Sequence, residues 1–194
     1  MQTPEREAVD TAQTLASKPV SQRRRQLLTG GVAAAALAAG AGWAWWQHRL
    51  GQPSAAALDG IWGQAFAAPG GQGEVRMQAF QGKPLLLNFW ATWCPPCVDE
   101  LPMLNQFYQA QRAKGWQVLG LAVDQDAAVQ RFLQRMPLAF PVAIAGMSGT
   151  QLTRDLGNSA GGLPFTVVFG RQGEVQHRKM GQLLASDLQN WASL

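Results

Sequence analysis

The stretch that decides the fold reads LLLNFWATWCPPC and occupies residues 85–97. Its first six residues predict a short buried strand, and a helix is predicted from Val98 to Lys114. Cys94 and Cys97 are the only two cysteines of the 194-residue chain, and they lie where the strand gives way to the helix. Because no third sulfur is available for a structural framework, the pair indicates a reversible dithiol.

The start of this helix suits a reactive thiol. Backbone N–H groups of a first helical turn have no partner within the helix, and together with the helix dipole they favour a thiolate over a thiol. Pro95 and Pro96 fit this turn, because they remove N–H groups that would be unpaired there, and they stiffen the ring that a disulfide closes. Pro102 lies deeper in the helix and predicts a kink behind the dithiol.

Strand and helix patterns alternate through the middle of the chain, which indicates a mostly parallel sheet with helices on its faces. The strands are predicted at 85–90, 117–123 and 140–145, and the further helices at 126–136 and 150–156. Asp124 and Asp126 follow a continuous apolar strand, so we expect them to cap the next helix, with metal binding as the alternative.

Two hairpins complete the predicted sheet. Residues 165–169 and 174–178 flank a Gly-containing turn and predict an antiparallel pair, which is followed by an amphipathic helix at 183–191. Nearer the N-terminus, residues 61–66 and 74–80 are separated by a Pro-Gly-Gly turn and predict a small extra hairpin ahead of the main unit.

The N-terminal segment reads as a targeting sequence. Arg23, Arg24 and Arg25 precede twenty uncharged residues, 27–46, which as a helix would cover about 30 Å, the thickness of a bilayer core. Few of these residues are strongly apolar, so a cleaved export signal and an uncleaved helix that anchors the chain in the inner membrane both remain open. Residues 24–28 resemble a twin-arginine export signal, and a buried core helix is a third interpretation.

The chain therefore divides into four expected parts. They are a polar tail at 1–22, the signal or anchor helix at 23–46, a linker at 47–57 and a single domain at 58–194. A signal or an anchor places the domain outside the cytoplasm, in the periplasm or an equivalent compartment, where a lone dithiol can be oxidised.

The charge does not indicate a nucleic-acid partner. The net charge is +4, but residues 1–48 hold five Lys and Arg against three acids, while the remainder holds eleven against nine. The folded part is thus nearly neutral, without the clustered positive surface that nucleic acids require.

Three motifs in order resemble the thioredoxin superfamily, and more narrowly its exported or membrane-anchored TlpA/ResA-like branch. They are WATWCPPC at 90–97, ELP at 100–102 and GLPFT at 162–166, and the resemblance extends from about residue 58 to the C-terminus. It implies a thioredoxin-like α/β fold with a central mixed sheet flanked by helices, here with the extra N-terminal hairpin and preceded by the signal or anchor helix.

The resemblance also implies the site residues. Cys94 would attack a substrate disulfide, Cys97 would resolve the mixed disulfide, and Pro164 would be a cis-proline facing them. The backbone edge of Leu163 could then pair with an extended substrate segment.

Glu100 matches a glutamate that this branch carries three residues after the second cysteine, where burial would make it a proton acceptor near neutral pH. Asn88 stands where thioredoxin itself has a buried aspartate. The alternative for Glu100 is that it simply opposes the dipole of the early helix.

The remaining candidates surround the cysteines or are histidines. Trp93 is either an exposed docking side chain or a core aromatic, and with Pro95 and Pro96 it is a candidate for substrate contact. His48 and His177 lie far from the cysteines in sequence, and we expect His177 on a strand surface rather than as a base.

We therefore expect an extracytoplasmic thiol-disulfide oxidoreductase, a protein disulfide reductase that needs no cofactor. The resemblance implies protein dithiol or disulfide substrates, an upstream membrane thiol reductase as electron donor, and a role in cytochrome c maturation with apocytochrome c as a partner. Two alternatives stay open: a carrier that binds Cu(I) or zinc through both thiolates, and a peroxiredoxin-like peroxidase.

Overall fold

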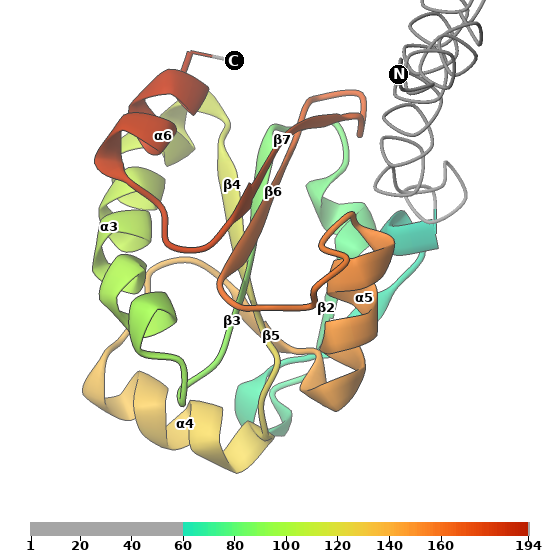
Figure 1. Ribbon diagram of the computed structural model, residues 1–194, viewed down its shortest axis with the longest axis vertical. Coiled ribbons are helices and arrows are strands. Elements are labelled where there is room, and N and C mark those ends of the chain that lie inside the picture. The colour runs from blue at the N-terminus through green and yellow to red at the C-terminus, as the bar shows by residue number, and fades with distance from the viewer. Residues whose placement is uncertain (1–59, 194) are drawn as a thin grey trace, which may run out of the picture. The chain divides into compact units, whose positions relative to one another are not determined.

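The computed structural model describes residues 60–193 (Figure 1). The expected tail, signal or anchor helix and linker, together with His48, lie outside the described residues. Between residues 60 and 193, no helix is both long and apolar enough to cross a membrane.

A mixed sheet with the strand order β2-β1-β5-β4-β3-β6-β7 forms the centre of the described part. β3 pairs in parallel with β4, and β4 in parallel with β5, while β6 is antiparallel to β3 and β7 is antiparallel to β6. The strands are β1 (Ala65–Ala67), β2 (Glu74–Arg76), β3 (Leu85–Trp90), β4 (Gln117–Ala122), β5 (Val142–Ile144), β6 (Phe165–Phe169) and β7 (Val175–Met180). This is the thioredoxin-like α/β architecture that the motifs imply.

Helices cover both faces of the sheet, with α3 and α6 on one side and α5 on the other (Figure 1). The α-helices are α3 (Pro95–Gln111), α4 (Asp126–Arg135), α5 (Gly149–Asp155) and α6 (Ala185–Trp191). Short 3-10 helices occupy η1 (Pro69–Gly71), η2 (Met77–Phe80), η3 (Arg112–Lys114) and η4 (Gly146–Ser148). α3 begins at Pro95, earlier than predicted, and continues through Pro102 without a break.

The alternation of side chains along β3 divides the core into two clusters. Leu86 and Trp90 pack with α3, α4 and α6, whereas Leu85, Leu87 and Phe89 pack with α5 and η2. All six residues of β3 are completely buried, as expected of a central strand covered on both faces. By the same alternation, the polar side chain of Asn88 belongs to the α3 face.

The first two strands are shorter than the predicted ones. β1 and β2 pair antiparallel, with Ala65 opposite Arg76. Ile61 lies in a helical turn, and residues 77–80 form η2 rather than continuing the strand. The reason is that Met77 and Phe80 both enter the core, and residues three apart lie on one side of a 3-10 helix but on opposite faces of a strand.

Candidate active site

The two cysteines are joined by a disulfide at the junction of β3 and α3, with their Cα atoms 5.3 Å apart. Cys94 is the N-cap of α3, and Pro95 is its first residue. Cys94 keeps 5% of its surface exposed, whereas Cys97 is fully buried. Of the two cysteines, only Cys94 therefore has surface that an incoming reagent can contact.

The loop that leads to Cys94 is tied to the neighbouring strand. Asp124, two residues after the end of β4, accepts hydrogen bonds through Oδ2 from the backbone N–H of Thr92 (2.9 Å) and from Thr92 Oγ1 (2.6 Å). Its Oδ1 accepts from the backbone N–H of Gln125 (2.7 Å). Because β3 and β4 are parallel, their carboxyl ends meet at one edge of the sheet, and this places Asp124 beside the loop.

The predicted capping role of Asp124 and Asp126 is wrong. Gln125 is the N-cap of α4, without a side-chain hydrogen bond. Asp126 instead accepts from the backbone N–H of Gly70 (2.9 Å) and from Gln130 Nε2 (2.7 Å), so it joins α4 to η1. Across residues 60–193, no three His, Cys, Asp or Glu side chains gather as metal ligands would.

Glu100 lies one helical turn beyond Cys97, on the buried side of α3, and only 1% of its surface is exposed. Its Oε1 accepts a hydrogen bond from Asn88 Nδ2 (2.7 Å), and its Oε2 accepts one from the backbone N–H of Leu183 (2.7 Å). Burial raises the pKa of Glu100 above its ordinary value, and the two hydrogen bonds only partly oppose that rise. Residues three apart on a helix are neighbours, so this carboxyl lies close to Cys97.

Asn88 and Thr166 face each other across β3 and β6 in the sheet register. Asn88 Nδ2 donates to Thr166 Oγ1 (3.0 Å) as well as to Glu100, whereas Asn88 Oδ1 is buried and has no hydrogen-bond partner. The polar cluster Asn88–Glu100–Thr166 is thus enclosed in the core on the α3 side of the sheet.

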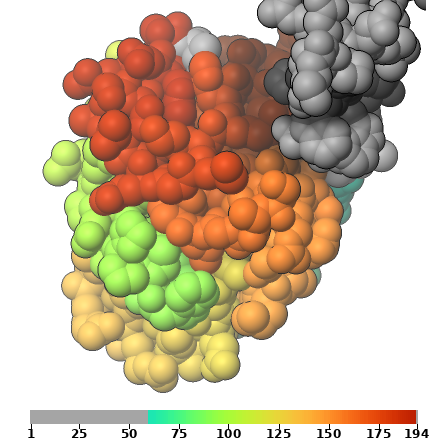
Figure 2. All heavy atoms as spheres, in the orientation of Figure 1, coloured from blue at the N-terminus to red at the C-terminus, as the bar shows by residue number. Residues whose placement is uncertain are grey.

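The loop before β6 brings Leu163 and Pro164 to the same edge of the sheet as the cysteines, because β6 is antiparallel to β3. The Leu163–Pro164 peptide bond is cis. The carbonyl of Pro164 accepts from the backbone N–H of Gly181 (2.9 Å), which fixes the end of β7 to this loop. On the face shown in Figure 2, α3 in green, the chain before β6 in orange and the C-terminal chain in red lie next to one another.

Trp93 is exposed over 64% of its surface, so the interpretation of this side chain as a core aromatic is wrong. Pro95 is also exposed, and Pro96 is half-buried. His177 lies on the exposed face of β7, as expected, and its ring stacks on Trp191 with the ring centroids 5.6 Å apart.

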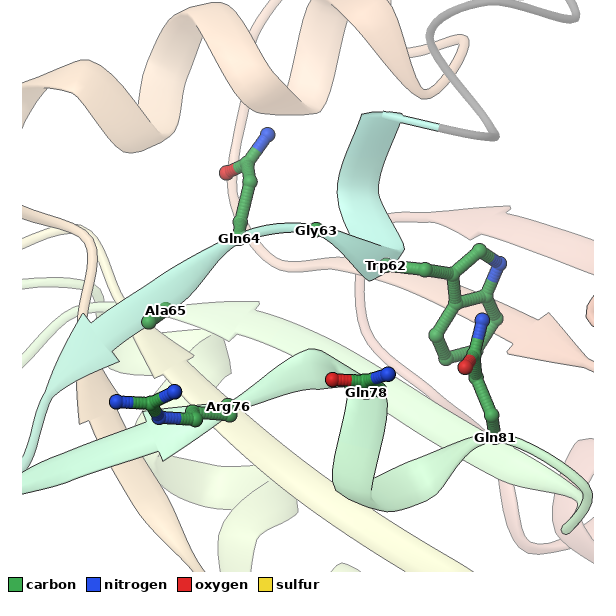
Figure 3. Close-up of a pocket in the computed structure, with 7 residues that line it drawn as sticks. All are labelled: Trp62, Gly63, Gln64, Ala65, Arg76, Gln78 and Gln81. Carbon is green, nitrogen blue, oxygen red and sulfur yellow. The ribbon is translucent and has the colours of Figure 1, made fainter.

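A separate hollow of about 320 Å³ lies at the β1–β2 hairpin and has a polar lining (Figure 3). Trp62 borders it and packs on Phe169 at the far end of β6 from Pro164, with ring centroids 5.1 Å apart. The other lining residues are Gly63, Gln64, Ala65, Arg76, Gln78 and Gln81. No cysteine lines this hollow, so it is separate from the dithiol.

The residues that sequence reasoning missed are Thr92, Thr166 and Leu183, together with the true role of Asp124. A signal existed for Asp124, since a polar residue that follows a parallel strand lies at the carboxyl edge of the sheet. Leu183 contributes only its backbone N–H, so its side chain carries no signal.

Comparison with known proteins agrees with this arrangement. The Redoxin family model matches residues 59–191. A thiol-disulfide oxidoreductase ResA of Bacillus cereus is 32% identical over 119 residues, which cover 61% of this chain and 66% of ResA. ResA of Geobacillus kaustophilus is 31% identical over 117 residues, which cover 60% of this chain and 65% of that ResA. The chain therefore spans just under two thirds of the length of these relatives.

Solved structures show the same fold. A structure described as a putative thiol:disulfide interchange protein DsbE from Chlorobium tepidum is 30% identical, with a TM-score of 0.58, and the match covers 68% of this chain and 90% of that one. A putative thioredoxin from Neisseria meningitidis is 26% identical, with a TM-score of 0.56 and coverage of 68% and 87%.

Proposed function

Since this chain belongs to the Redoxin family, within the TlpA/ResA-like branch of the thioredoxin superfamily, we propose that it is a thiol-disulfide oxidoreductase acting through Cys94 and Cys97. One observation carries the proposal. The only two cysteines of the chain lie bonded to each other at the start of α3, one with exposed surface and one buried, and the buried one has a buried carboxyl within a helical turn.

The proposed reaction begins with both cysteines reduced. The Cys94 thiolate attacks one sulfur of a substrate disulfide, which forms a mixed disulfide and releases the first substrate thiolate. Cys97 then loses its proton to Glu100, and its thiolate attacks Cys94 Sγ. The Cys94–Cys97 disulfide forms and the second substrate thiolate leaves. Two electrons pass from the enzyme dithiol to the substrate, and the two substrate thiolates take up two protons.

The roles of the two cysteines follow from their positions. The dipole at the start of α3 favours the thiolate of Cys94, and the 5% of its surface that is exposed lets a substrate approach. Cys97 is buried, which disfavours its thiolate, so it needs a base nearby. Glu100 is suited to this role because its raised pKa lies nearer to that of a thiol than an ordinary carboxyl would.

The substrate-binding surface that we propose is formed by the exposed side chain of Trp93, the ring faces of Pro95 and Pro96, and the loop of Leu163 and Pro164. Neither the N–H nor the carbonyl of Leu163 has a backbone partner among the described residues, so both can pair with an extended substrate segment. Trp93, directly before Cys94, would pack on the side chains that flank the substrate cysteine.

We further propose that the protein acts outside the cytoplasm as a disulfide reductase, with an upstream membrane thiol reductase as its electron donor and apocytochrome c among its substrates. The resemblance to the TlpA/ResA-like branch supports this placement, and so do the three arginines and the long uncharged run at 23–46. Residues 58–194 would form the exported catalytic domain.

The test is reduction of a disulfide-bonded protein by the purified protein with dithiothreitol as donor. Cys94→Ser should abolish turnover. Cys97→Ser, reduced first and mixed with the substrate after the dithiothreitol has been removed, should accumulate mixed disulfides that appear on non-reducing gels. Unchanged turnover in both variants, Cu(I) binding without turnover, or hydrogen peroxide consumption that depends on Cys94 would contradict the proposal. A reduction potential above about −150 mV would reject the reductive direction alone.

A further inference from the structure

The buried polar cluster is complementary to only one protonation state of Glu100. Both carboxyl oxygens accept hydrogen bonds, Oε1 from Asn88 Nδ2 and Oε2 from the backbone N–H of Leu183. An ionised carboxylate accepts at both oxygens, so the arrangement is satisfied as it stands. A protonated carboxyl presents an O–H, which faces a donor at either position.

The two donors differ in what they can do. The N–H of Leu183 belongs to the backbone and can only donate. The carboxamide of Asn88 has a donor and an acceptor of nearly the same shape, and its acceptor Oδ1 has no partner in the present orientation although the residue is fully buried. A half turn about the Cβ–Cγ bond would bring Oδ1 to the position that Nδ2 now holds.

We propose that Asn88 is the positioning residue for the proton acceptor, and that its carboxamide turns over each time Glu100 gains or loses a proton. With Glu100 ionised, Nδ2 donates to Oε1. With Glu100 protonated at Oε1, the new O–H donates to Oδ1 of the turned amide. This inference rests on the proposed function, in which Glu100 takes its proton from Cys97.

Thr166 suits both orientations. Its hydroxyl now accepts from Asn88 Nδ2 at 3.0 Å, and by rotating its O–H it can donate to Oδ1 after the turn. After the turn, Oδ1 accepts from both hydroxyls, and the two N–H donors of Nδ2 take the position without a partner that Oδ1 holds now. The amide itself neither gains nor loses a proton: the proton moves from Cys97 Sγ to Glu100 Oε1 and later to solvent.

Few charged groups surround this cluster. On α3, the ionisable neighbours are Cys97 and Cys94, which do not titrate in the disulfide form. β3 and β6 contribute Asn88 and Thr166, which are neutral. β7 and α6 bring Lys179 and Asp187, which pair with each other at 3.1 Å. In the oxidised protein, Glu100 is therefore the one titrating group in direct contact with Asn88 among the described residues.

The experiment is an NMR titration of the oxidised protein, labelled with ¹³C and ¹⁵N, that follows the side-chain NH₂ signals of Asn88 and the carboxyl carbon of Glu100. As the pH is lowered, we expect the chemical shifts of the Asn88 NH₂ protons to move away from hydrogen-bonded values. The midpoint of this change should lie at the same pH as the midpoint of the Glu100 titration. Asn158 is the matched control, because its Nδ2 donates to the backbone carbonyl of Gly162 at 2.7 Å and should stay constant through that midpoint. Asn88 signals that remain hydrogen-bonded throughout would overturn the proposal.

Glu100→Gln provides a second readout. The backbone N–H of Leu183 should hold the new carboxamide oxygen on its side, so that the new NH₂ group faces Asn88. We expect the Asn88 signals of this variant to match the acid form of the unmodified protein and not to change with pH. Signals that match the alkaline form would count against the turn. Neither measurement uses disulfide reduction, so a failed titration with intact turnover rejects only this inference.

Discussion

Two carboxylates flank the dithiol, and their surroundings differ. Asp124 lies at the end of β4 with 8% of its surface exposed and accepts three hydrogen bonds, two from Thr92 and one from Gln125. Glu100 lies within the core with 1% exposed, and accepts two hydrogen bonds from residues 12 and 83 positions away. Asp124 thus holds a loop in place, whereas burial raises the pKa of Glu100 above its ordinary value.

This difference indicates which of the two carboxylates suits proton transfer. A carboxylate that ties together neighbouring backbone and hydroxyl donors contributes mainly to the shape of the loop before Cys94. A carboxylate whose pKa is raised by burial next to a buried thiol can exchange a proton with it. The comparison predicts that substitutions at the two positions separate activity from stability.

The largest effect is expected for Glu100→Gln, which removes the proposed proton acceptor and keeps the shape of the side chain. We expect the rate of disulfide exchange near pH 7 to fall about a hundredfold, because general base catalysis contributes at least that much. The rate should then rise only at the higher pH at which Cys97 ionises unaided. Stopped-flow kinetics from pH 5 to 9 give the profile.

The matched control for this substitution is Asp99→Asn, on the adjacent exposed position of α3. It changes the net charge of the protein by the same amount without touching the cluster. A Glu100→Gln profile that superimposes on the Asp99→Asn profile would return Glu100 to the simple role of opposing the helix dipole.

The second effect concerns stability. Asp124→Ala leaves the N–H and the hydroxyl of Thr92 without their acceptor, and we expect a loss of about 2 kcal/mol in the free energy of unfolding. Thr92→Val removes only the hydroxyl bond and should cost about half as much. Urea denaturation of the oxidised proteins measures both. Equal stability of all three proteins would mean that Asp124 does not anchor the loop.

The third prediction uses the pH dependence of stability. Because the pKa of Glu100 is raised in the folded protein above the ordinary value of 4.5, folding favours the protonated form. We compare the free energy of unfolding of the unmodified protein with that of Glu100→Gln. The unmodified protein should compare best below pH 4.5 and lose stability as the pH rises through the pKa of Glu100 in the folded protein. The loss is about 1.4 kcal/mol for each unit of the rise in pKa.

Urea denaturation of both proteins in steps between pH 4 and 8 gives this difference. The Asp124→Asn protein serves as the comparison at the other carboxylate. A constant difference between the unmodified protein and Glu100→Gln over the whole range would show that burial does not disfavour the ionised form of Glu100.

The smallest effect is expected for Trp93→Ala, at the exposed position that the Thr92–Asp124 bonds hold beside Cys94. We expect a change below about 0.5 kcal/mol in the free energy of unfolding, since the side chain is mostly exposed. KM for a protein disulfide should rise several-fold, whereas the rate with a small disulfide such as oxidised glutathione should stay the same. Equal effects on both substrates would exclude a docking role.

The sequence predicts the central part of this fold well, because the local patterns there are unambiguous. Residues 85–90 are apolar apart from Asn88, residues 165–169 are apolar or β-branched, and both strands have the predicted bounds. Predictions fail where tertiary contacts decide. Residues 77–80 carry an apolar pattern that suits a strand, yet Met77 and Phe80 enter the core together as a 3-10 helix.

For the site, the motifs indicate Cys94, Cys97, Glu100 and Pro164, and the structure brings all four to one region. The partners of Glu100 could not be predicted in the same way. Thr166 becomes a neighbour only through the register of β3 with β6, and the N–H of Leu183 only through the loop that joins β7 to α6. These contacts depend on long-range packing, which no local pattern specifies.

The hydrogen bond from the N–H of Leu183 to Glu100 joins positions 83 residues apart. A ribosome adds residues in order, so both thiols leave it well before the donor that completes the surroundings of the carboxyl. A chain that has not yet reached Leu183 therefore holds both cysteines, but Glu100 Oε2 still lacks its backbone donor. The surroundings of Glu100 become complete only when the segment from Leu183 through α6 has been made and has packed against α3.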